Sequence, residues 1–332
     1  MLTLRFDFRL KPDSPATMQE LYESALEMCS WGERNKAITV MFSEHHGSSD
    51  GYLPSPIIMA AAAAVRTETL TFNIGALLLL MYDPIKLAED IAVLDHLSGG
   101  RVGYTIGLGY REEEYEMFDV DKQHRGKEIE ERINALRHAL SGEPFEWRGR
   151  RIHVQPKPLT PRGPLIAYGG GSKAAAERAA RMGMMFFPQT SDPKMAAFYD
   201  QEAKRVGNPP GLTMGPSEGA PTTVFVAENL DQGWEQYGPY MLHDAVSYRG
   251  WMGEGNNSAS LSQASSITEL RDENGPYRVV TPKEAVKLVH QYQSLPLQPL
   301  CGGIPPGLAW SSLLLIEAVS YTHLTLPTIY SV

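Results

Sequence analysis

Short apolar runs recur along this chain, and amphipathic segments separate them. The runs predict eight strands, at residues 2–8, 37–42, 70–79, 102–108, 164–168, 184–188, 222–227 and 299–301. Helices are predicted to begin at residues 17, 56, 84, 128, 173, 193, 231, 281 and 305. Most strand candidates are continuous apolar runs rather than alternating ones, which is typical of parallel strands buried on both faces. Strands and helices in alternation therefore predict an α/β fold, a (β/α)8 TIM barrel.

A doubly wound sheet is the competing α/β architecture. Its nucleotide-binding fingerprint needs three glycines after an early strand, and Gly107-Leu108-Gly109 lacks the third at the required spacing. The pattern therefore favours the barrel.

Three segments depart from the alternation of strands and helices. Residues 145–155 predict a hairpin, and residues 250–275, rich in Gly, Asn and Ser, predict an insertion or lid. Residues 320–332 replace a helical pattern with Thr, Pro and β-branched residues. We interpret them as a non-native tail that resembles translated sequencing-adapter read-through. The prediction is one barrel domain over residues 1–319.

Composition narrows the possible functions. The chain has 332 residues, 42% of them hydrophobic and 21% charged, with a net charge of -9. This acidic balance argues against nucleic-acid binding. The longest apolar runs are shorter than the roughly 20 residues that span a membrane, and no signal peptide is recognisable. Cys29 and Cys301 form no disulfide framework, so we expect a cytoplasmic protein.

Two adjacent histidines and a carboxylate, in Ser43-Glu44-His45-His46-Gly47, follow the second predicted strand. In parallel α/β proteins, chemistry is usually located where a strand gives way to a loop. Adjacent side chains on an extended backbone point to opposite sides, so His45 and His46 are a poor metal pair and we predict no metal site. The chain also lacks a Gly-x-Ser-x-Gly nucleophile motif.

Gly169-Gly170-Gly171-Ser172 precedes a predicted helix. Glycines allow close approach of an anion, and free N–H groups at a helix start can bind a phosphate. A helix start that only needs glycine for its turn is the alternative, and the sequence leaves both open.

Taken together, these motifs resemble the luciferase-like monooxygenases over about residues 2–318. The resemblance is carried by Ser43-Glu44-His45-His46, by Tyr52-Leu53-Pro54-Ser55-Pro56 with the following Ala run, by Leu94-Asp95-His96-Leu97-Ser98-Gly99-Gly100-Arg101, and by residues 169–183. It implies a (β/α)8 barrel that binds reduced FMN, or the deazaflavin F420, at the carboxyl end of the strands.

The resemblance also implies site residues. His45 matches the family's catalytic histidine. Ala76, Leu77 and Leu78 match the strand end behind the flavin, where many members have a non-prolyl cis peptide. Gly107 and Gly109 match the next strand end, and Gly171 and Ser172 match the phosphate-binding loop. Leu108 stands where bacterial luciferase has a phosphate-binding arginine, so a clamp of that type is not expected here.

The implied function is a flavin-dependent monooxygenase that uses FMN, reduced by a separate flavin reductase, and O2 on a small organic substrate. A homodimer is also implied. Two alternatives stay open: hydride transfer that depends on F420, and flavin binding without catalysis.

Overall fold

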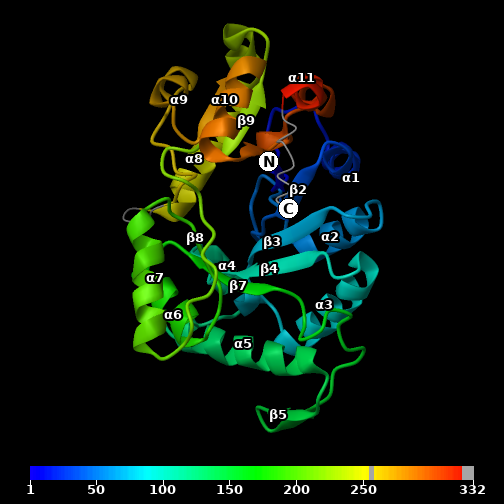
Figure 1. The fold of residues 1–332 in the computed structure, drawn as a ribbon, viewed down its shortest axis with the longest axis vertical. Helices are drawn as coiled ribbons and strands as arrows, with labels where there is room; N and C mark the ends of the chain where they lie inside the picture. Colours follow the sequence, from blue (N-terminus) through cyan, green and yellow to red (C-terminus); the bar gives the residue numbers. More distant parts are fainter. Residues whose placement is uncertain (254–257, 324–332) are drawn as a thin grey trace, which may run out of the picture. The chain divides into compact units, whose positions relative to one another are not determined.

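The computed structural model describes residues 1–253 and 258–323. Its chain divides into two compact units, coloured by sequence in Figure 1. Of the described residues, unit 1 comprises 1–40, 219–249 and 260–323, and unit 2 comprises 41–218, 250–253 and 258–259. Strand β2 (Ala37–Phe42) and helix α8 (Leu230–Met252) each contribute residues to both units. The expectation of a single domain over residues 1–319 stays a prediction.

Unit 2 is built on four parallel strands in the order β3-β4-β7-β8. These strands are β3 (Thr71–Leu77), β4 (Val102–Ile106), β7 (Ile166–Gly170) and β8 (Phe186–Pro188). The helices are α2 (Pro56–Ala64), α3 (Pro84–Ser98), α4 (Glu112–Met117), α5 (Arg125–Ser141), α6 (Lys173–Arg181) and α7 (Pro193–Arg205), with a 3-10 turn at Leu79–Met81. Helix α3 packs against α5, and α6 against α7 (Figure 1). The predicted hairpin is confirmed as β5 (Phe145–Trp147) and β6 (Arg150–Ile152).

Unit 1 contains a second set of parallel strands, in which β9 is paired along both of its edges. Its strands are β1 (Leu2–Phe6), the first part of β2, β9 (Thr223–Val226), β10 (Tyr277–Val280) and β11 (Leu295–Leu297). Its helices are α1 (Met18–Arg34), most of α8, α9 (Ile267–Glu273), α10 (Pro282–Tyr292) and α11 (Pro306–His323). Strand β9 pairs with β10 on one side and with β11 on the other, and β11 also pairs with β1.

The prediction of a strand at residues 299–301 is wrong. The strand is β11, at Leu295–Leu297, and a 3-10 turn occupies Cys301–Gly303. Pro296 lies inside β11, and a proline normally argues against a sheet strand because it cannot donate a ladder hydrogen bond. Helix α9 was missed because it lies in the segment 250–275, which was predicted as an insertion or lid. Strand β10 and helix α4 were also not predicted. The order of the other strands and α-helices agrees with the prediction.

Local capping explains several of the helix starts. A capping box starts α1: the Thr17 side chain accepts from the Glu20 N–H at 3.3 Å, and Glu20 Oε2 accepts from the Thr17 N–H at 2.7 Å. Helix α11 continues to His323, so residues 320–323 are helical. Residues 324–332 of the predicted tail, and residues 254–257 of the predicted lid, lie outside the described residues.

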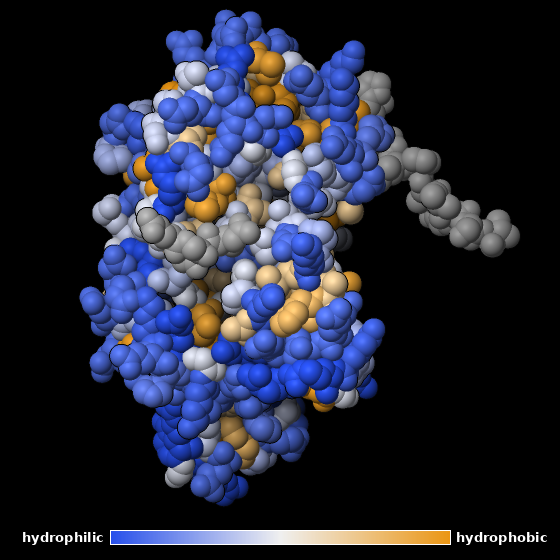
Figure 2. All heavy atoms as spheres, turned by 90° about the vertical axis from the view of Figure 1, so that its left-hand side faces the viewer, coloured by the Kyte–Doolittle hydropathy of each residue, from blue (hydrophilic) through white to orange (hydrophobic). Residues whose placement is uncertain are grey.

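No helix in the described ranges is long and apolar enough to cross a membrane. On the face drawn in Figure 2, hydrophilic residues predominate and hydrophobic residues form smaller patches.

Unit 1 contains a cluster of buried charges. Arg9 Nε lies 2.9 Å from Asp244 Oδ1, and both side chains are fully buried. Gln298 donates to Asp7 Oδ2 at 2.6 Å, and Arg5 lies 3.7 Å from the same oxygen. Burial and, after it, the neighbouring Asp244 raise the pKa of Asp7 to about 7, against the opposing charges of Arg5 and Arg9.

This shift predicts a pH-dependent effect of Asp7→Asn. The pKa of Asp7 is higher in the folded than in the unfolded chain, so the wild type takes up a proton on folding between about pH 4 and 7 and loses stability as the pH rises through this window. The asparagine side chain of the variant does not titrate. The unfolding free energy of the variant minus that of the wild type should therefore increase with pH, by up to about 1.4 kcal/mol per pH unit between about pH 4 and 7. Urea unfolding at several pH values measures this, and a difference independent of pH would contradict it.

Candidate active site

The predicted site residues of unit 2 follow strands whose carboxyl ends lie at one edge. Leu77 is in register with Ile106, and Ile106 with Tyr168. Ala76 and Leu77 end β3 and Leu78 follows it, whereas the glycines at 107 and 109 follow β4 and residues 171 and 172 follow β7. Because parallel strands end at the same edge, the sequence correctly grouped these residues.

His45 is held between two partners in the loop after β2. Its Nδ1 lies 2.7 Å from Glu114 Oε1, and its Nε2 lies 3.0 Å from the Tyr110 hydroxyl. His45 is 6% exposed, and the side chain of Glu114 is fully buried. Glu114 Oε1 also accepts the His46 N–H at 2.9 Å. Both ring nitrogens of His45 are therefore engaged within unit 2.

The charge state of Glu114 follows from these contacts. Burial alone would raise its pKa. The hydrogen bond and charge of His45, the His46 N–H and the charge of Arg111 outweigh burial and lower the pKa below the usual range. Glu114 is therefore a carboxylate at neutral pH, and a carboxylate can only accept hydrogen bonds.

Glu44 connects the histidine loop to the end of β3. Its Oε2 accepts the Leu78 N–H at 2.7 Å, and its Oε1 contacts His46 Nε2 at 3.1 Å and the Tyr82 hydroxyl. His46 also packs edge-on against Phe118, with ring centroids 4.7 Å apart. Glu44 and His46 thus support the site, and the histidines do not form a pair.

Three aromatic rings surround His45. Tyr52 and Trp251 each lie with ring centroids 4.9 Å from it, and Tyr110 at 5.1 Å, all in edge-on geometry. The Arg111 guanidinium lies 4.3 Å from the centre of the Trp251 ring and donates to the His46 carbonyl at 2.5 Å. This shell restricts the access of water to the imidazole.

The ends of β3 and β4 approach closely. The peptide bond between Gly75 and Ala76 is cis, as the family resemblance implied for this strand end. The Gly107 N–H donates to the Leu77 carbonyl at 3.0 Å, and a Cβ on Gly107 would lie only 2.7 Å from Ala76 Cβ. Gly109 has a positive φ of +77°, which disfavours other residues. The chain therefore requires glycine at both positions.

Ser172 is the N-cap of α6. Its side chain accepts the Ala175 N–H at 3.2 Å, so a helix starts after this loop as predicted. This helix start is compatible with anion binding, because the loop residues are at least partly exposed and helix starts favour negative charge.

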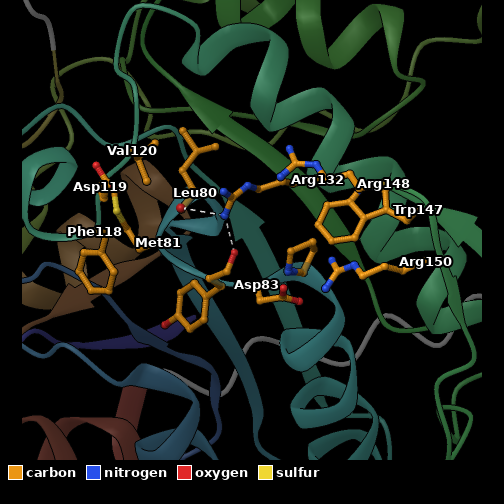
Figure 3. A pocket seen from close by; sticks show the side chains of 12 residues that line it. Leu80, Met81, Asp83, Phe118, Asp119, Val120, Arg132, Trp147, Arg148 and Arg150 are labelled. Atoms are coloured by element: carbon orange, nitrogen blue, oxygen red, sulfur yellow. Dashed lines mark hydrogen bonds between the residues drawn. The ribbon is translucent and has the colours of Figure 1, made fainter.

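A polar hollow lies beside the site, with a volume of about 270 Å³ (Figure 3). Arg132 donates to the carbonyls of Leu80 and Tyr82, at 3.0 and 2.5 Å. Arg148 forms two hydrogen bonds with Glu128, at 2.6 and 2.8 Å. The hollow is lined by Leu80, Met81, Tyr82, Asp83, Pro84, Phe118, Asp119, Val120, Arg132, Trp147, Arg148 and Arg150. Arg132 and Arg148 thus already bind groups of this chain, and Arg132 holds the loop that carries Tyr82.

Sequence reasoning missed Tyr110, Arg111, Glu114 and Trp251. The first three lie in or just before α4, whose sequence, Glu-Glu-Glu-Tyr-Glu-Met, has no apolar periodicity. Trp251 was noted only as the start of a lid. An acidic residue soon after the Gly107 to Gly109 turn was the one available signal. Within residues 1–253 and 258–323, no group of three or more His, Cys, Asp or Glu could hold a metal ion.

The strands, helices and strand-edge site define an α/β protein of the TIM-barrel type. A family model described as luciferase-like monooxygenase matches residues 6–297, and the chain belongs to this family.

Solved structures show the same fold. The monooxygenase RslO1 from Streptomyces bottropensis aligns with a TM-score of 0.73 at 21% identity, covering 96% of this chain and 98% of that one. The oxygenating constituent of 3,6-diketocamphane monooxygenase from Pseudomonas putida, in complex with FMN, aligns with a TM-score of 0.71 at 18% identity. The alignment covers 97% of this chain and 98% of that one.

Among curated relatives, the oxygenase component of flavin-dependent trigonelline monooxygenase from Acinetobacter baylyi is 27% identical over 157 residues. The match covers 45% of this chain and 43% of that protein. This chain thus matches less than half the length of that relative.

Proposed function

We propose that this protein is the oxygenase component of a flavin-dependent monooxygenase that acts on a small organic substrate. The observation that carries the proposal is the buried histidine at 45, held between Glu114 and Tyr110 beside the closely packed ends of β3 and β4. Family membership supports it, as does the name of the trigonelline relative. The term "oxygenase component" in that name favours a separate reductase that supplies reduced FMN.

The residues present fit a flavin. The side-chain-free surface at Gly107 and Gly109 lets a planar ring lie against the backbone. Glu114 Oε2 is buried and has no hydrogen-bond partner within the part of the chain that the structure describes, so it can accept from a bound group. Gly171 and Ser172 would receive the phosphate at the start of α6. Ala76, Leu77 and Leu78 would lie behind the ring.

When bound, reduced flavin supplies the electrons that activate O2. The protein's own residues orient the reactants and exclude water. Trp251 and Tyr52 cover the imidazole, and Leu78 and Leu77 are buried at the strand end. His45 is the acid/base group, since an imidazole exchanges protons near neutral pH.

Titration of the purified protein with FMN and with F420, followed by absorbance, tests the cofactor. Tight binding of FMN, and O2 consumption with product when reduced FMN and candidate substrates are added, are expected. Product formed without O2 from reduced F420 alone would instead support hydride transfer. Flavin binding with no turnover of any substrate would support a binding protein.

A further inference from the structure

Tyr110 is more exposed than His45, to which its hydroxyl is hydrogen-bonded. Tyr110 is only half-buried, whereas the imidazole is covered and its Nε2 already lies 3.0 Å from the tyrosine hydroxyl. Of these two side chains, Tyr110 is therefore the more accessible to an approaching substrate.

The carboxylate of Glu114 fixes which nitrogen of His45 carries the proton. An ionised carboxylate accepts only, so the hydrogen of the neutral imidazole lies on Nδ1, 2.7 Å from Glu114 Oε1. Nε2 then has a lone pair, and the Tyr110 hydroxyl is its donor. The hydrogen bonds consequently run in one direction, from Tyr110 through His45 to Glu114.

We propose that these three residues form a proton relay in which Tyr110 is the catalytic residue that touches the substrate and Glu114 is a positioning residue. A substrate hydroxyl or N–H group loses its proton to the Tyr110 oxygen as the proton of Tyr110 moves to His45 Nε2. The resulting imidazolium keeps its Nδ1–H on the Glu114 carboxylate, which stabilises the charge. The reverse transfer returns the proton to the product, so the relay consumes nothing. This proposal rests on the proposed function for its turnover but not for its hydrogen bonds.

Two further charged groups, Glu44 and Arg111, lie close to the relay. Glu44 faces His46 and Tyr82, at 3.1 Å from His46 Nε2, and Arg111 lies 3.7 Å from Glu114 Oε1. Arg111 also fixes Trp251 over the imidazole. Glu114 is thus the carboxylate whose oxygen contacts the His45 ring.

Two conservative variants test the relay in the full-length protein. Tyr110→Phe keeps the ring and removes the hydroxyl, and should lower kcat by about 100-fold with little change in KM. Glu114→Gln keeps the shape and removes the charge, and should lower kcat by about 10- to 100-fold. Flavin affinity should change less than threefold in both. Glu116→Gln, on the same helix and exposed, and Tyr292→Phe, half-buried on α10 with its hydroxyl donating to the Gly219 carbonyl at 2.9 Å in unit 1, are the matched controls and should retain wild-type rates.

Nitrogen-15 NMR of His45 in the flavin-free protein gives a readout that does not depend on turnover. The wild type should show the Nδ1–H tautomer, and Tyr110→Phe should shift Nε2 toward the resonance of a free lone pair. Glu114→Gln should lower the pKa of His45. An Nε2–H tautomer in the wild type, or wild-type kcat in Tyr110→Phe, would overturn the relay. Absence of turnover in the wild type, with the expected NMR spectra, would refute the proposed function and the catalytic role of Tyr110, and would confirm only the direction of the hydrogen bonds.

Discussion

Replacing His45 with asparagine is expected to lower kcat by about 10²- to 10⁴-fold, the range that general acid–base groups contribute. Asparagine is smaller and cannot take up a proton, so Tyr110 and Glu114 lose their common partner. Flavin affinity should change only a few-fold, because the glycines after β4 and the start of α6 are untouched. O2 consumption coupled to product formation measures the rate, and absorbance titration measures the affinity.

His290→Asn is the matched control for this experiment. His290 is exposed on α10 and belongs to unit 1, so the variant should keep the wild-type rate. If His45→Asn kept the wild-type rate as well, His45 would have no acid/base role. If flavin binding were lost together with the rate, His45 would be a binding residue.

Arg9→Met is expected to reduce the unfolding free energy by about 3–5 kcal/mol, the usual cost of removing one member of a buried ion pair. Arg9 and Asp244 are both fully buried in unit 1, and the Arg9 guanidinium lies 4.6 Å from the centre of the Tyr248 ring. The substitution leaves the Asp244 carboxylate buried with a weaker set of partners. Tyr277 still donates to it at 2.8 Å, and Arg5 is 3.8 Å away.

Arg271→Met is the matched control, because Arg271 pairs with Asp231 at 2.8 Å at the surface of the same unit. Exposed pairs contribute about 0.2–1 kcal/mol, so this variant should unfold nearly as the wild type does. Adding Asp244→Asn to Arg9→Met should recover part of the loss by removing the unpaired charge. Urea unfolding of the four proteins measures these differences, and an Arg9→Met variant as stable as the control would refute the account.

Prediction from sequence succeeded where a short-range pattern decides the local structure. The hairpin predicted within residues 145–155 formed as β5 and β6, and the helix predicted to begin at residue 17 starts with the capping box of Thr17 and Glu20. Arg101, in the Ser98-Gly99-Gly100-Arg101 motif, donates to the carbonyls of Ala64 and Leu70 at 2.7 and 2.8 Å. These features depend on residues close in sequence or on one strongly specific side chain.

Prediction failed where partners come from distant positions. Strand β10 is too short and too near Gly275 and Pro276 to be recognised, and it forms because β9 offers it an edge to pair with. Helix α4 begins with three consecutive acidic residues and was not predicted, yet Glu114 is fully buried, with His45, 69 positions earlier, lying against it.

The sequence by itself determined the parallel α/β character, the family, and the set of strand ends at 45, 76–78, 107–109 and 171–172. The spacing of apolar residues and the continuous apolar runs specify which segments become strands. The carboxyl ends of parallel strands then lie at the same edge of the sheet. Only the tertiary structure decided that His45 is bonded to Glu114 and Tyr110 and covered by Trp251. The reason is physical: a hydrogen bond requires its two atoms to lie about 3 Å apart, and the packing of the strand-end loops sets that distance.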